Sequence, residues 1–379
     1  MANFLFLRPQ KLSGAQMIRF YTLLLLVFTA GVTLGQAPSK FTLSGYVKDG
    51  TNGESLLAAS VYVVQLGKGT NTNEYGFYSM SLPADTYTIR ISYVGFGVKE
   101  QQVILDKDTK LNVEMGTTSV ETQEVVITGE RKGENVESTD MGKQEVKIEQ
   151  AKALPALLGE VDILKTLQLL PGIQSAGEGN SGFYVRGGGP DQNLVLLDDA
   201  VVYNTGHLFG FFSVFNSDAI KNTTVVKGGM PANYGGRISS VVDVQMKEGN
   251  MKRWNVEGGI GLISSRLTVQ GPIKKDKCSF IVSARRTYID LLLKPILPHI
   301  GDGSFAGNEY YFYDINAKIN YRISDKDRLY MSGYFGRDVF NFQDPGGNFK
   351  LNFAWGNTTD TYRHNHVFNY RLFLNTMFI

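Results

Sequence analysis

The sequence predicts a mainly β protein made of a small β-sandwich, an α+β domain and a set of longer strands that would cross a membrane. Three observations support this fold class. The 379 residues include 42 Gly, 19 Tyr and 23 Phe, a composition that suits strands joined by many turns. Apolar and polar residues alternate in short runs up to residue 247 and in longer runs after it. One of the longer runs has a wholly apolar face, which a strand in contact with lipid requires.

Residues 1–35 are predicted to form a secretory signal peptide. Three basic residues precede an apolar run over residues 20–30, and small residues follow it up to Gly35. A run of about eleven residues is too short to span a bilayer as a helix, so we expect cleavage after it. No cysteine lies near the cleavage point, which excludes a lipoprotein anchor. The start of translation stays open between Met1 and Met17.

Residues 41–115 are predicted to form a small all-β sandwich. Apolar and polar residues alternate in five runs, which are separated by clusters of Gly, Asn, Asp and Pro at residues 49–53, 73–76 and 82–85. About seventy-five residues in six or seven short strands are enough for two packed sheets.

Residues 116–150 are predicted to be a polar linker. They are rich in Glu, Lys and Thr and show little apolar periodicity. The linker contains one β-prone segment, whose extended backbone either adds a strand to a partner's sheet or packs on a neighbouring domain. This segment consists of Glu124, Val125, Val126, Ile127 and Thr128.

Residues 151–247 are predicted to form an α+β domain. Four short strands are expected at residues 182–186, 193–197, 223–227 and 239–245. A helix precedes them, because apolar residues recur at the spacing of one helical face and a Pro-Gly pair follows. The residues on this face are Ile163, Leu164, Leu167 and Leu170.

Residues 311–323 show the clearest membrane pattern. Every second residue is apolar or aromatic, and five of the six residues between them are polar. Such a strand presents an apolar face to lipid and a polar face to a wet interior, and it is long enough to cross a bilayer. A strand of a soluble sandwich would alternate in a similar way, so this alternative stays open. The residues assigned to the lipid-facing side include Tyr311, Tyr313, Ile315, Ile319 and Tyr321.

Seven strands are expected in residues 248–379. Short charged turns at residues 274–277 and 324–327 alternate with longer loops at 293–308 and 343–348, as in outer-membrane barrels. Seven strands cannot close into a barrel, and an open sheet edge in lipid leaves backbone groups unpaired. We therefore expect an N-terminal fragment with an incomplete barrel. The expected strands cover residues 256–262, 266–273, 278–292, 310–323, 329–342, 349–368 and 372–379.

Three motifs in residues 193–244 resemble the plug domain of TonB-dependent outer-membrane transporters. They are NLVLLDD, AIKNTTVVKGG and NYGGRISSVVDV, in this order. Residues 41–115 resemble the carboxypeptidase-regulatory-like domain, through GYVKDGTNGESLLAASVYV and GTNTNEYGFYSMSLPADTYTIRISYVGF; this module precedes the plug in many such transporters. The plug-motif residues are Arg186, Gly187, Asp198, Asp199, Lys227, Gly228, Gly229, Tyr234, Gly235, Gly236 and Arg237.

The resemblance implies a cell outer-membrane location and energy-coupled uptake of a nutrient. It implies that residues 124–128 are the TonB box, which pairs with TonB of the TonB–ExbB–ExbD complex, and that the sandwich and the linker lie in the periplasm. It also implies that charged plug residues hold the plug to the barrel wall, with ordinary solvation as the alternative. The substrate could be a siderophore, cobalamin, a glycan or a peptide, and a surface substrate-binding lipoprotein is a second candidate partner.

Composition argues against other classes of function. The net charge of +2 and the lack of a basic stripe exclude a nucleic-acid partner. The four histidines form no H-E-x-x-H arrangement, so we expect no enzyme, no metal and no cofactor. The paired glycines are predicted to form turns, because no G-x-x-x-x-G-K-[ST] motif is present. Cys278, the single cysteine, excludes a disulfide framework. A secreted or surface β-domain adhesin is the remaining alternative.

Overall fold

The structure is a computed structural model that describes residue 22 and residues 39–116, 142–154, 159–177, 180–300, 307–344 and 348–379. The predicted signal peptide, apart from residue 22, and the candidate TonB box at residues 124–128 lie outside the described residues. The described chain is mainly β, as the sequence predicts. None of the helices in this part of the chain has both the length and the hydrophobicity that a membrane crossing needs.

The first part of the described chain, which we call the small sandwich, has two four-stranded sheets. One sheet has the order β4-β1-β7, with β8 also paired to β1, and the other has the order β3-β2-β5-β6. Apolar side chains of both sheets, such as Leu43 and Ile89, form one buried cluster between them. The strands are β1 (Lys40–Asp49), β2 (Ser60–Val63), β3 (Lys68–Asn71), β4 (Phe77–Pro83), β5 (Asp85–Ser92), β6 (Lys99–Leu105), β7 (Thr109–Lys110) and β8 (Val113–Met115).

The second part, which we call the central domain, folds around a five-stranded sheet of order β13-β12-β17-β16-β9. Strands β12 and β17 are parallel, and the other neighbours are antiparallel. Short helices cover one face and share its apolar core. The main elements are β9 (Lys143–Lys147), α3 (Ile148–Lys152), α4 (Ile163–Leu167), β10 (Ile173–Ser175), β11 (Phe183–Val185), η2 (Pro190–Gln192), β12 (Asn193–Leu197), β13 (Ala200–Val201), β14 (Gly206–His207), η3 (Leu208–Gly210), β15 (Phe212–Ser213), β16 (Ile220–Val226) and β17 (Ser240–Met246).

Two segments of the central domain differ from the prediction. Strand β9, which pairs with β16, lies within the predicted linker. Among those of its side chains that the structure describes, only Val146 is buried, so the strand leaves little periodicity in the sequence. Helix α4 is shorter than its apolar spacing suggests. Asp162 caps its first turn, but the N–H of Leu170 bonds to the carbonyl of Leu167, three residues back, which tightens the chain before Pro171.

The third part, which we call the long sheet, has seven antiparallel strands, each paired with the next along the chain. All seven predicted strands are present. The predicted strand 278–292 is wrong at its end: β20 stops at Thr287 and helix α5 (Ile289–Leu293) follows, because the leucines at 291–293 break the alternation. In the described chain, β18 and β24 pair on one side only. The strands are β18 (Asn255–Ile260), β19 (Ser264–Lys274), β20 (Cys278–Thr287), β21 (Glu309–Arg322), β22 (Asp327–Gln343), β23 (Lys350–Val367) and β24 (Phe373–Phe378).

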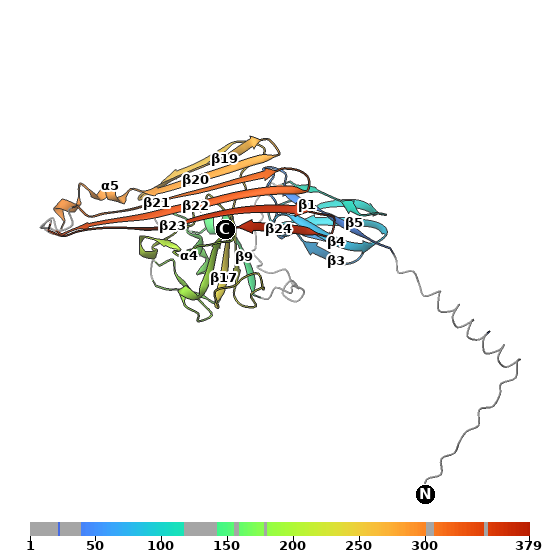
Figure 1. Ribbon diagram of the computed structural model, residues 1–379, viewed down its shortest axis with the longest axis horizontal. Helices are drawn as coiled ribbons and strands as arrows, with labels where there is room; N and C mark the ends of the chain where they lie inside the picture. The colour runs from blue at the N-terminus through green and yellow to red at the C-terminus, as the bar shows by residue number, and fades with distance from the viewer. Residues whose placement is uncertain are drawn as a thin grey trace, which may run out of the picture.

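Figure 1 shows how the three parts are arranged. The long sheet is a curved layer that covers the central domain, and the small sandwich lies at the end of the sheet away from α5. The turns at residues 274–277 and 324–327 are tight and lie at the sandwich end. We define the candidate site as the polar contacts between the central domain and the long sheet.

Candidate functional site

The long sheet buries polar side chains and exposes apolar ones. In β21, Asp314 and Lys318 are 0% and 5% exposed, whereas Ile315 and Ile319 are 45% and 39% exposed. The exposed set also includes Tyr321, while Tyr311 and Tyr313 are half-buried. A sheet with one face in water normally shows the opposite distribution. The buried charges of β21 therefore need partners, and the central domain supplies them.

A two-residue turn of the central domain carries two of these partners. Strands β12 and β13 pair Leu197 with Ala200, so only Asp198 and Asp199 connect them. Both have positive φ, 47° and 71°, which is the backbone of a type I′ hairpin. Aspartate is one of the few side chains that tolerate this conformation. The turn therefore presents two adjacent carboxylates at one end of the strand.

Each of these carboxylates contacts a cation of the long sheet. The Lys318 Nζ lies 2.8 Å from Asp198 Oδ2, and the Arg363 guanidinium donates to Asp199. The other oxygen of Asp198 accepts the N–H of Met246 at 3.0 Å. Burial raises the pKa of Asp198, but Lys318 and Arg363 outweigh it and hold that pKa below its usual value. Asp198 is therefore ionised in the interface.

A second group of contacts surrounds His207 of β14. Its Nδ1 lies 2.7 Å from Asp338 Oδ2, its Nε2 lies 3.4 Å from Asp314 Oδ2, and its ring stacks on Phe312 with centroids 4.1 Å apart. The Arg285 Nε donates to Asp314 at 2.9 Å. Burial lowers the pKa of His207, but the hydrogen bonds with Asp314 and Asp338 raise it by more, so the pKa lies above its usual value.

Two further carboxylates of the central domain bind the first strands of the long sheet. Asp218 Oδ2 accepts from Arg266 Nε at 2.7 Å, and Glu160 Oε2 lies 3.5 Å from Arg285 Nη1. Lys152 of the central domain pairs with the other oxygen of Asp218 at 3.1 Å. Burial raises the pKa of Asp218, and Arg266 and Lys152 together lower it below its usual value.

Glu248 joins all three parts of the chain. Its N–H donates to Glu54 of the small sandwich at 2.8 Å. Its Oε2 accepts from Asn320 Nδ2 of the long sheet at 2.9 Å, and its Oε1 lies 3.7 Å from Lys221 Nζ of the central domain. Burial raises the pKa of Glu248, but Lys221 and Arg328 lower it by more. The position where the chain enters the long sheet is therefore fixed by charge.

An aromatic group lies where η3 meets the long sheet. Phe209 is 69% exposed, and the rings of Tyr310, Phe340 and Trp355 have centroids within 6.3 Å of its own. Phe209 and Leu208 both have positive φ, near 50°, which is a costly backbone for apolar residues. The N–H of Leu208 donates to Asp338 at 3.1 Å, which holds this strained turn against the sheet.

The predicted plug-motif residues divide into two groups. Asp198 and Asp199 reach the long sheet, whereas Lys227 bonds to Gln144 and Pro171 within its own domain. The Arg237 guanidinium bonds to the neighbouring Gly236 carbonyl, and Arg186 is exposed.

The remaining motif residues lie in turns or pack within the central domain. Gly228 and Gly229 follow β16 with φ of 131° and 62° and turn the chain. Tyr234 packs on the sheet and donates to Asp243 at 3.3 Å, and Gly187 and Gly235 lie in turn or loop segments.

One group of described side chains has the composition of a metal site. Asp327, His364 and His366 place one ligand atom each within 4.8 Å of the others. Asp327 Oδ1 lies 2.6 Å from His366 Nδ1 and 3.2 Å from His364 Nε2, so hydrogen bonds account for the grouping. It lies on β22 and β23, apart from the interface with the central domain.

The sequence prediction did not select His207, Lys318 or Arg363 as site residues. Lys318 falls on the polar face of the predicted strand 310–323. A charged residue on that face is the signal that could have identified it as a site residue. Arg363 likewise lies between the outward-facing Tyr362 and His364 in β23. His207 belongs to a two-residue strand, which is too short to show any periodicity.

Two family models match the chain once each. Residues 43–127 match the CarboxypepD_reg-like domain, and residues 142–242 match the TonB-dependent Receptor Plug Domain. The small sandwich and the central domain are therefore these two domains. TonB-dependent receptors are transporters rather than enzymes, which agrees with the prediction of no enzymatic activity. No curated protein matches the chain.

Solved structures of outer-membrane receptors are also similar to the chain. The siderophore receptor PirA from Acinetobacter baumannii has 18% identity and a TM-score of 0.42, over 64% of this chain and 39% of that one. The outer membrane transporter YddB from Escherichia coli has 14% identity and a TM-score of 0.44, over 60% and 37%. The alcaligin receptor FauA from Bordetella pertussis has 14% identity and a TM-score of 0.42, over 60% and 36%. The chain spans less than two fifths of the length of these relatives.

Proposed function

We propose, from the premise that the chain carries a TonB-dependent receptor plug domain behind a carboxypeptidase-regulatory-like domain, that it is part of an outer-membrane receptor for energy-coupled nutrient uptake. The central domain is then the plug, the long sheet is the first part of the barrel wall, and the small sandwich lies on the periplasmic side. We also propose that the signal peptide, the sandwich, the linker and the plug end at residues 35, 115, 150 and 247, where the sequence predicts these boundaries.

The proposal rests on β21, which exposes apolar side chains and buries charged ones. Ile315, Ile319 and Tyr321 are exposed on the side away from the central domain, while the charges between them are buried. In water this arrangement leaves apolar area solvated, at a cost of about 25 cal/mol per Å². In lipid the same area is well solvated and the polar residues stay on the plug side. A bilayer is therefore the surrounding that fits this sheet.

The ion pairs in the interface are costly to break, which suits a plug that moves only when an energy source acts on it. The pairs Asp198–Lys318 and Asp218–Arg266 are buried or nearly so, and removing one partner of a buried pair costs about 3–5 kcal/mol. In the proposed cycle, substrate binds near the aromatic group around Phe209. The TonB–ExbB–ExbD complex then pulls through residues 124–128 and breaks the pairs in turn.

The experiment labels adjacent outward-facing and inward-facing positions with a fluorophore. In a Cys278→Ser background, Ile319→Cys and Asn320→Cys are labelled and the full chain is reconstituted in vesicles with brominated lipid. We expect the lipid to quench the label at 319 strongly and the label at 320 weakly, because Asn320 is buried against Glu248. Equal quenching at both positions, or none at 319, would overturn the membrane assignment.

A further inference from the structure

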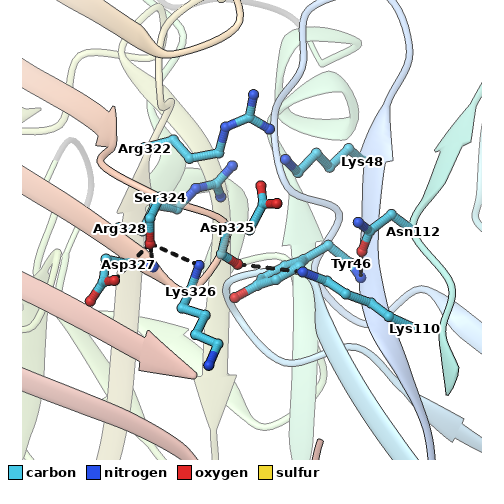
Figure 2. A pocket seen from close by; sticks show the side chains of 10 residues that line it. All are labelled: Tyr46, Lys48, Lys110, Asn112, Arg322, Ser324, Asp325, Lys326, Asp327 and Arg328. Carbon is cyan, nitrogen blue, oxygen red and sulfur yellow. Dashed lines mark hydrogen bonds between the residues drawn. The ribbon is translucent and has the colours of Figure 1, made fainter. Parts of the chain in front are cut away.

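A small pocket lies where the small sandwich meets the turn between β21 and β22. Tyr46, Lys48 and Asn112 line it from the sandwich, and Arg322 and Arg328 line it from the long sheet, as Figure 2 shows. Its volume is about 30 Å³, which corresponds to two or three water-sized groups. The pocket therefore has room for one small tetrahedral group, either a free ion or the phosphate of a larger molecule.

Cations converge on this pocket from both sides. Five cations line it: Arg328 is buried, Lys48 and Arg322 are half-buried, and Lys110 and Lys326 are exposed. Arg328 is 5% exposed. Its Nη1 donates to Ser55 and Tyr330, but its Nη2 is buried without a hydrogen-bond partner among the described residues. A buried guanidinium N–H group without an acceptor is costly, so this residue of the pocket lining still needs an acceptor.

The acidic residues near the pocket neutralise these cations only in part. Asp327 is bound to Ser324 and His366, and Glu248 lies 4.0 Å from Arg328 while it also binds Asn320. Asp325 lines the pocket, but among the described residues no ion pair within 4.0 Å joins it to a cation. Lys110 reaches only the backbone carbonyl of Asp325, at 3.5 Å.

The surroundings of Lys48 show the same excess of positive charge. Its ammonium lies 5.8 Å from the centre of the Tyr46 ring. Burial, together with repulsion from Arg328 and Arg322, outweighs the attraction of Glu248 and Glu114 and lowers the pKa of Lys48 to about 7. An anion in the pocket would reverse this repulsion and raise the pKa again, so that its binding near neutral pH would take up a proton.

We propose that this pocket binds a phosphate-type oxyanion, held by Lys48, Arg322 and the free Nη2 of Arg328. Arginine forks and lysine are the usual ligands of such ions. The anion would bridge the small sandwich and the turn between β21 and β22 and so hold the two together. It could be free phosphate or the headgroup of an anionic lipid. The pocket itself does not depend on the proposed transport function.

The test uses the full chain in detergent or in lipid nanodiscs and measures binding by calorimetry. Inorganic phosphate probes the free ion, and phosphatidylglycerol nanodiscs are compared with phosphatidylcholine nanodiscs to probe a headgroup. We expect Lys48→Met and Arg322→Gln each to weaken binding at least tenfold. Lys275→Gln, at an exposed lysine of the neighbouring turn, is the matched control and should bind like the wild type.

Two further measurements separate anion binding from a structural effect of the variants. Sulfate, which does not titrate near neutral pH, should bind with proton uptake that depends on Lys48 and disappears in Lys48→Met. Asp325→Asn removes a negative charge from the pocket and should tighten binding severalfold. Phosphate binding without lipid preference assigns a free ion, and lipid preference alone assigns a headgroup. No saturable binding in either arm, or equal affinity in Lys48→Met and Lys275→Gln, would overturn the proposal.

Discussion

Asp198 and Asp199 show how two residues can connect separate parts of a chain. Their positive φ angles form a turn, and their carboxylates meet Lys318 and Arg363 on the long sheet. The sequence identified both aspartates through a motif and placed Lys318 on a polar strand face. It could not pair them, because the contact joins residues more than one hundred positions apart and depends on how the domain docks.

Lys318→Met tests the most buried of these pairs. It leaves the Asp198 carboxylate buried without its cation, so we expect the free energy of unfolding to fall by about 3–5 kcal/mol. Denaturant unfolding of the full chain in detergent measures this change. Lys275→Met is the control, because that lysine is exposed in a turn. Adding Asp198→Asn to Lys318→Met should recover part of the loss; no recovery would show that the pair is not the cause.

His207 makes the interface sensitive to pH. Its pKa is raised above the 6.5 of an ordinary histidine, so folding favours the protonated ring. This contribution is complete below pH 6.5 and is lost as the pH rises through the higher pKa of the folded state. We expect the unfolding free energy of the wild type to fall over this window and that of His207→Gln to fall less. His299→Gln, at an exposed histidine, should behave like the wild type.

Strand β21 shows what alternation can and cannot predict. The period of two located the strand to within one residue at each end and predicted the alternation of more and less buried residues along it. It could not decide which face meets the protein, because a soluble sandwich alternates in the same way. The structure shows which face it is, because the central domain packs on the face that carries Asp314 and Lys318 and buries both residues. The short elements β9 and β14 escaped prediction for the opposite reason, since they contain too few residues for a period.

A charge on the outward face of β21 should have a cost that depends on depth. Ile315 lies in the middle of the strand, and Tyr321 lies next to its end. In a bilayer, we expect Ile315→Lys to destabilise the inserted protein by about 2–4 kcal/mol and Tyr321→Lys by about 0–1 kcal/mol. Denaturant titration of vesicle-inserted protein measures both. Equal costs at the two positions would contradict a strand that crosses the membrane.

At the scale of the whole molecule, the two ends of the long sheet differ. Tight turns and the small sandwich occupy one end, and α5 occupies the other (Figure 1). The proposed topology places the first end in the periplasm and the second outside the cell. The sequence indicated this asymmetry through the lengths of its turns and loops, but not the contacts between the sandwich and the sheet.

Cysteine labelling of intact cells tests this orientation. In a Cys278→Ser background, Lys350→Cys lies at the α5 end and Lys275→Cys at the sandwich end, and both positions are exposed. An impermeant maleimide should label Lys350→Cys in intact cells and Lys275→Cys only after the outer membrane is permeabilised. The reverse result would invert the topology, and labelling of both in intact cells would reject it.

For a receptor of the proposed kind, the alternation of β21 also bears on export from the cytoplasm. Five of the six residues that separate the outward-facing ones are polar, so this segment does not contain the roughly 20 consecutive apolar residues that would cross a bilayer as a helix. Under the proposed function, this segment would therefore cross the inner membrane without being retained there as a helix. Its apolar surface would form only when the strands pair, because pairing places the apolar and the polar side chains on opposite faces of the sheet.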